Sequence, residues 1–124
     1  KMKINELLEK VERTKQPTLA RVIYTFDVRM PNHNPRSAEE QEKNLKKSLR
    51  LYNGKIIKEK GGSKYGPKGT RFEFAWLLLF NKYNDYYRFK HENDDATHTL
   101  IYTVDEGLID KDWWSLSPKR GIYK

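Results

Sequence analysis

The chain of 124 residues contains no cysteine, which excludes both a disulfide framework and a thiolate metal site. Small secreted domains often depend on such cross-links, so their absence favours a cytoplasmic protein. Long hydrophobic runs are missing too: the longest, residues 74–80, is far shorter than the about 20 residues that span a bilayer. The amino-terminal residues carry no apolar core of signal-peptide length. We therefore expect a soluble cytoplasmic protein that makes no use of a membrane.

Common nucleotide-binding and catalytic motifs are also absent. The chain has no GxxxxGK[ST] phosphate loop, no GxGxxG fingerprint and no GxSxG nucleophile motif. A zinc site would need more ligands at closer spacing than His33, His91 and His98 offer, and without cysteine only carboxylates could supply them. We therefore expect neither a cofactor nor a metal.

Positive charge is what the chain has in excess, and it is concentrated in one segment. The net charge is +8, but residues 43–71 hold ten cations against the single acid Glu59, which gives this segment +9 and leaves −1 for the rest. The cations are Lys43, Lys46, Lys47, Arg50, Lys55, Lys58, Lys60, Lys64, Lys68 and Arg71. A concentrated basic segment indicates a negatively charged partner, either nucleic acid or an acidic protein surface.

Hydrophobic periodicity predicts an α+β fold, with two helices packed on a mostly antiparallel sheet of about five strands. Apolar residues recur at helical spacing over residues 4–14 and 37–52. The strands are expected at residues 20–30, 55–60, 72–80, 86–91 and 97–104. We expect a single domain over residues 1–124, with an irregular aromatic tail from about residue 108.

The helix predicted at 37–52 carries the first part of a possible binding surface. Lys43, Lys46, Lys47 and Arg50 follow at helical spacing and share one side of the helix. The helix dipole alone also favours cations toward a carboxyl end, so this pattern by itself fits both a ligand site and a solvated helix. The helix is expected to stop at residues 53–54, with glycine in the left-handed conformation.

The glycine-rich stretch at residues 61–69 favours a ligand site over a solvated helix. We expect it to form a basic loop in which Lys64 and Lys68 approach phosphates closely, with Tyr65 as a platform for a base. Helix, strand lysines and loop together predict a nucleic-acid-binding surface over residues 43–71 that acts mainly through phosphate contacts. Lysine outnumbers arginine there, which suits electrostatic attachment more than reading of bases.

Two alternatives remain open from the sequence. The first is an inhibitor or assembly component, possibly of phage origin given the lysine-, asparagine- and tyrosine-rich composition, that acts on a nucleic-acid-processing enzyme. Trp113 and Trp114 would then be candidate partner contacts, because exposed tryptophan is enriched at interface hot spots.

The second alternative is a metal-independent ribonuclease with His91 and His98 as acid and base, facing each other across a predicted hairpin beside a lysine such as Lys90.

Overall fold

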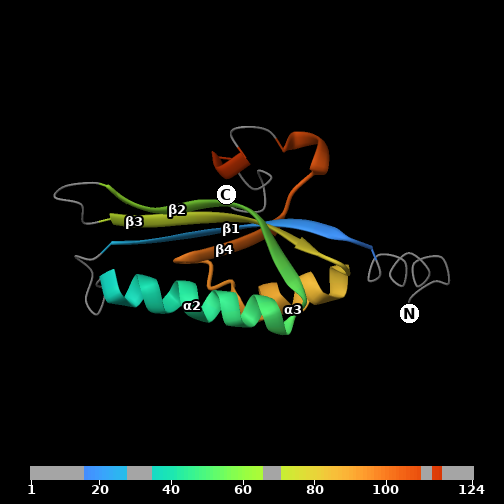
Figure 1. Cartoon of the computed structure of the whole chain (residues 1–124), viewed down its shortest axis with the longest axis horizontal. Coiled ribbons are helices and arrows are strands. Elements are labelled where there is room, and N and C mark those ends of the chain that lie inside the picture. The colour runs from blue at the N-terminus through green and yellow to red at the C-terminus, as the bar shows by residue number, and fades with distance from the viewer. Residues whose placement is uncertain (1–15, 28–34, 66–70, 110–112, 116–124) are drawn as a thin grey trace.

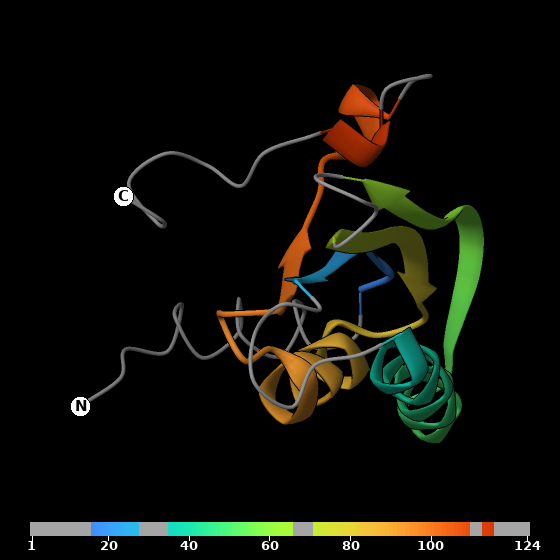
Figure 2. The same cartoon turned by 90° about the vertical axis from the view of Figure 1, so that its left-hand side faces the viewer.

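The computed structural model describes residues 16–27, 35–65, 71–109 and 113–115, and within them a four-stranded sheet with helices on one face (Figure 1). The strands are β1 (Thr18–Asp27), β2 (Gly54–Tyr65), β3 (Arg71–Phe80) and β4 (Thr99–Thr103). They are ordered β2-β3-β1-β4, and every neighbouring pair is antiparallel. The helices α2 (Pro35–Leu51) and α3 (Tyr83–Asn93) lie side by side beneath the sheet (Figures 1 and 2). The predicted α+β class is confirmed.

The main core lies between the sheet and the two helices. Alternate residues of β1 and β3 point toward the helices, as the two-residue period of a strand requires. Tyr24 and Phe74 are directly paired across the two strands, and their ring centroids are 5.1 Å apart. The buried residues of this core are Ala20, Val22, Tyr24, Phe26, Ala38, Leu45, Leu49, Phe74, Trp76, Leu78, Phe80, Tyr86, Phe89 and Ile101.

A smaller apolar cluster lies on the opposite face of the sheet. Ala75 and Leu77 of β3 pack there with Trp113, which belongs to the short 3-10 helix η3 (Trp113–Ser115). This segment and η2 (Glu106–Leu108) lie above the sheet in Figure 1, on the side away from α2 and α3. Because β3 is covered on both faces, its run of consecutive apolar residues fits a central strand.

The fifth predicted strand is wrong, because residues 86–91 belong to helix α3. Tyr86 and Phe89 are the buried residues of this helix, and their three-residue separation places both on one side of a helix. The alternating Tyr87 and Phe89 suggested a strand, but Tyr87 is exposed while Phe89 is buried. Of the two predicted helices, 37–52 corresponds to α2, and 4–14 lies outside the described residues.

The link from α2 to β3 also differs from expectation. Strand β2 continues through residue 65 and pairs with β3 as far as Tyr65 opposite Arg71, so residues 61–65 of the predicted loop are strand; residues 66–70 lie outside the described part. Register shifts interrupt this pairing between positions 56 and 58 and between positions 60 and 63. Asn53 rather than Gly54 takes the left-handed conformation after α2, with a φ of 58°.

No helix in the described part of the chain is long and apolar enough to cross a membrane.

Candidate nucleic-acid interface

Helix α2 presents its cations on the flank that lies away from α3. Ser48 marks the α3 side, because its hydroxyl oxygen accepts a hydrogen bond of 2.7 Å from the Asn93 side-chain amide. Lys46, two residues earlier, lies roughly 160° around the helix from Ser48 at the spacing of an α-helix. Lys43 and Arg50 project from neighbouring turns of the same flank. We call Lys43, Lys46, Lys47 and Arg50 the α2 cation row.

Three members of the α2 cation row are open to solvent. Lys43, Lys47 and Arg50 are exposed, and none of them makes an ion pair with another residue that the structure describes. Lys46 is half-buried, and its ammonium lies 5.8 Å from the centroid of the Trp76 ring. The row therefore combines one cation held against the core with three whose charges are available to an anion.

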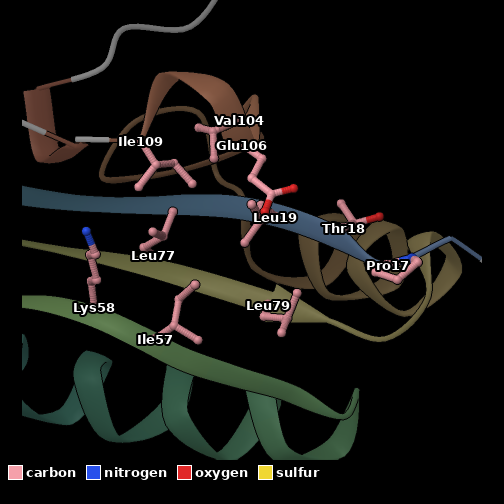
Figure 3. A pocket seen from close by; sticks show the side chains of 10 residues that line it. All are labelled: Pro17, Thr18, Leu19, Ile57, Lys58, Leu77, Leu79, Val104, Glu106 and Ile109. Carbon is pink, nitrogen blue, oxygen red and sulfur yellow. The ribbon is translucent and has the colours of Figure 1, made fainter.

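The lysines of β2 lie on the opposite face of the sheet from the α2 cation row. Lys55, Lys58 and Lys60 pair across the ladder with Leu79, Leu77 and Ala75, and directly paired residues of antiparallel strands share a face. Figure 3 shows Lys58 beside Leu77 on this face. All three lysines are exposed, and the ammonium of Lys60 lies 4.4 Å from the Trp114 ring centroid. We call these three residues the β2 lysines.

The predicted basic surface over residues 43–71 is therefore divided between two faces that adjoin the same edge strand, β2. Arg71 at its end forms an ion pair of 3.6 Å with Asp27, directly opposite it on β1. Lys64 and Tyr65 occupy the last residues of β2, but their side chains lie outside the described part, as does all of Lys68.

The two histidines proposed as an acid–base pair do not flank a hairpin. His91 lies near the end of α3, where its ring stacks near Tyr87, whereas His98 precedes β4 and its Nδ1 lies 3.2 Å from the Thr25 carbonyl oxygen. Lys90 is engaged as well: its ammonium donates to the Asp94 carboxylate at 2.8 Å and to the Ile101 carbonyl oxygen. The hairpin on which the ribonuclease hypothesis depended is absent, and His33 lies outside the described residues.

The two tryptophans have different environments. Trp113 is only 6 % exposed, and its carbonyl oxygen accepts a 2.9 Å hydrogen bond from the buried guanidinium of Arg21. Burial lowers the pKa of Arg21 to about 10, although the negative charge of Glu73 acts to raise it. Trp114 is half-buried against Trp113 in an edge-to-face arrangement with centroids 6.1 Å apart. Of the pair, only Trp114 offers surface to a partner.

Sequence reasoning missed a group of aromatic side chains on α3. The strand predicted over residues 86–91 leaves unused the four-residue spacing of Tyr83, Tyr87 and His91, which places the three rings on one side of a helix. The signal was present in the sequence, since these rings recur at intervals of four while Tyr86 and Phe89 supply the apolar side.

The face of the sheet opposite the helices has a hollow of about 650 Å³ beside the C-terminal segments (Figure 3). Aliphatic side chains form most of its wall, including Ile57, which is 46 % exposed at the register shift in β2. Charged groups at this hollow are Lys58 and Glu106. Among the described residues, no cluster of three or more histidine, aspartate or glutamate side chains is placed to hold a metal ion.

The chain matches no known protein-family model and no curated protein.

Proposed function

We propose that this protein binds nucleic acid without catalysis, through phosphate contacts centred on the α2 cation row. The observation that carries the proposal is the exposure of Lys43, Lys47 and Arg50 on successive turns, with no ion pair to another described residue. Residues one turn apart on a helix have Cβ atoms about 5–6 Å from one another, so neighbouring cations repel and an anionic ligand bound along the flank would stabilise them.

The charge distribution supports a polyanion over a small anion. Cations continue from α2 into β2, whose lysines adjoin the same edge of the sheet from its other face. A polymer with regularly spaced phosphates can contact such an extended series, whereas a single phosphate would neutralise only part of it. Contacts of this kind position a nucleic acid without reading its bases.

The test is a salt titration of binding to DNA and RNA. Neutralising about 4–6 phosphates gives a log–log slope of affinity against salt of roughly −3 to −5. Substituting Lys43, Lys47 and Arg50 together by alanine should make this slope shallower by roughly 2–3, since each lost contact contributes about 0.7–0.9.

Lys82 supplies the matched control, because it is also an exposed cation but lies at the start of α3. Lys47→Ala should weaken binding more than Lys82→Ala, although both remove one charge. An equal effect would show that the α2 cation row is not the centre of the phosphate contacts, and absence of binding at low salt would refute the proposal.

The second candidate function is docking on an acidic protein surface. It is favoured by Leu51, which is 74 % exposed directly after Arg50 and adds an apolar contact at the end of the cation row. Affinity capture from a nuclease-treated lysate separates the two functions. A partner that is retained after nuclease treatment and lost with Leu51→Ser supports protein docking, whereas loss of all bound material supports nucleic acid.

A further inference from the structure

One side of α3 carries a row of aromatic rings that begins at the half-buried Tyr83, which packs against the core, and continues to the exposed Tyr87 and His91. Tyr83 and Tyr87 have ring centroids 6.4 Å apart and an angle of 27° between their planes; for Tyr87 and His91 the values are 6.5 Å and 14°. At this separation each ring covers only part of its neighbour. Tyr87 is 54 % exposed, and His91 is exposed too. We call these three residues the α3 aromatic row.

Two hollows meet at the exposed end of this row, with volumes of about 580 Å³ and 390 Å³. Besides Tyr87 and His91, the first is lined by Tyr52, Arg88 and Glu92, and the second by Lys90, Asp94 and Ala96. Both therefore offer aromatic rings among polar groups. That chemistry suits a planar, polar ligand better than an aliphatic side chain.

The charged groups around the two hollows are not equivalent. Glu92 accepts a hydrogen bond from the Tyr52 hydroxyl, an interaction that raises the pKa of Tyr52. Asp94 is occupied by Lys90, as described above. Arg88 is exposed, lies with its guanidinium carbon 5.4 Å from the Tyr52 ring centroid, and makes no ion pair with another described residue. The cation available to a ligand at the larger hollow is thus Arg88.

We propose that the α3 aromatic row stacks with unpaired bases of a single-stranded nucleic acid, while Arg88 contacts a neighbouring phosphate. This inference rests on the proposed function and adds a preference for single strands over duplexes, because a duplex hides the faces of its bases. Stacking of this kind tolerates any sequence, since every base has a π-face. The net charge of +8 attracts the strand, and the row then distinguishes a strand that has accessible bases from one that does not.

The experiment compares three oligonucleotides of equal length: an unstructured single strand, the same strand with abasic sites, and a duplex. Tyr87→Ala should lower the affinity for the base-bearing single strand about tenfold, since stacking of one base is lost. Affinity for the abasic strand and for the duplex should stay unchanged. Tyr87→Phe is the matched control, because it keeps the ring and should bind like the parent protein.

The outcomes separate this inference from the function on which it rests. If Tyr87→Ala binds the base-bearing strand as the parent does, or weakens all three ligands equally, base stacking is overturned while phosphate binding stands. If the parent protein binds none of the three at low salt, both proposals fall. Capture of a nuclease-resistant protein partner that Tyr87→Ala abolishes would assign the row to a protein contact and overturn the stacking proposal.

Discussion

At the scale of single residues, the turn between α2 and β2 depends on two adjacent residues for different reasons. Asn53 has a φ of 58°, in the left-handed region that asparagine tolerates better than most residues. Gly54 permits a close approach instead: a Cβ there would collide with Leu49 Cδ1 and would lie 2.6 Å from Phe80 Cε2. Both neighbours are buried in the core, so neither can move away freely.

We expect Gly54→Ala to lower the free energy of unfolding by about 2 kcal/mol, because the added methyl group overpacks the core. Gly61→Ala is the control within the same strand, since a Cβ at that position meets nothing within 4 Å. Urea denaturation of the two variants measures the difference. Equal stability of the two would show that Leu49 and Phe80 can adjust around the methyl group.

At the scale of an element, the loop from α3 to β4 is organised by one carboxylate. Asp95 Oδ1 accepts hydrogen bonds from the backbone N–H groups of Thr97, His98 and Thr99 at 2.9, 2.8 and 2.7 Å. Partial burial raises the pKa of Asp95, but these backbone donors lower it by more, with help from the nearby His98. The net result is a pKa below the ordinary value of 3.8.

A lowered carboxyl pKa stabilises the folded state when the group is ionised. The contribution of Asp95 should be complete above about pH 5 and should be lost as the pH falls through the folded-state pKa. We therefore expect Asp95→Asn to be less stable than the parent at neutral pH, with the gap closing in acid. Thermal unfolding across this range measures it.

Asp105→Asn is the control, because the Asp105 side chain makes no capping hydrogen bond to η2. Its stability relative to the parent should change less with pH. A gap for Asp95→Asn that stays constant into acid would show that the ionised form is not what the loop requires.

At the scale of the whole molecule, the sheet separates the two sets of exposed cations. The α2 cation row lies on the helix side, and the β2 lysines lie on the side of the C-terminal segments. The row itself is roughly 10 Å long from Lys43 to Arg50, at about 1.5 Å per residue. A ligand that contacts both sets must therefore pass around the β2 edge.

This arrangement predicts that the two sets depend differently on ligand length. Replacing Lys55 and Lys58 by alanine should not affect a strand of about 6 nucleotides but should weaken one of about 20. Replacing Lys43 and Lys47, the matched change on α2, should weaken both. Fluorescence anisotropy measures the four affinities. If the β2 pair weakens the short strand as much as the α2 pair does, the two sets do not act as separate surfaces.

How far the fold could be predicted depended on whether one local pattern dominated each segment. Strands β1 and β3 were found because their alternation extends over many residues, and α2 because its apolar stripe is regular. Segment 83–93 is short and aromatic, so Tyr87 and Phe89 fitted a strand as well as a helix. The sequence predicts one basic surface over residues 43–71 for a related reason: residues close in sequence can lie on opposite faces of a sheet.

The sequence by itself determined the α+β class, the central place of β3 and the concentration of positive charge in residues 43–71, because composition and periodicity are local properties. Tertiary structure alone decided that this charge is divided by the sheet and that His91 stacks near Tyr87 on α3. The physical reason lies in packing. Helix α2 covers one face of the sheet while the β2 lysines point from the other, and burial of Tyr86 and Phe89 against the core decides between the helical and the strand pattern, both of which residues 83–93 offer.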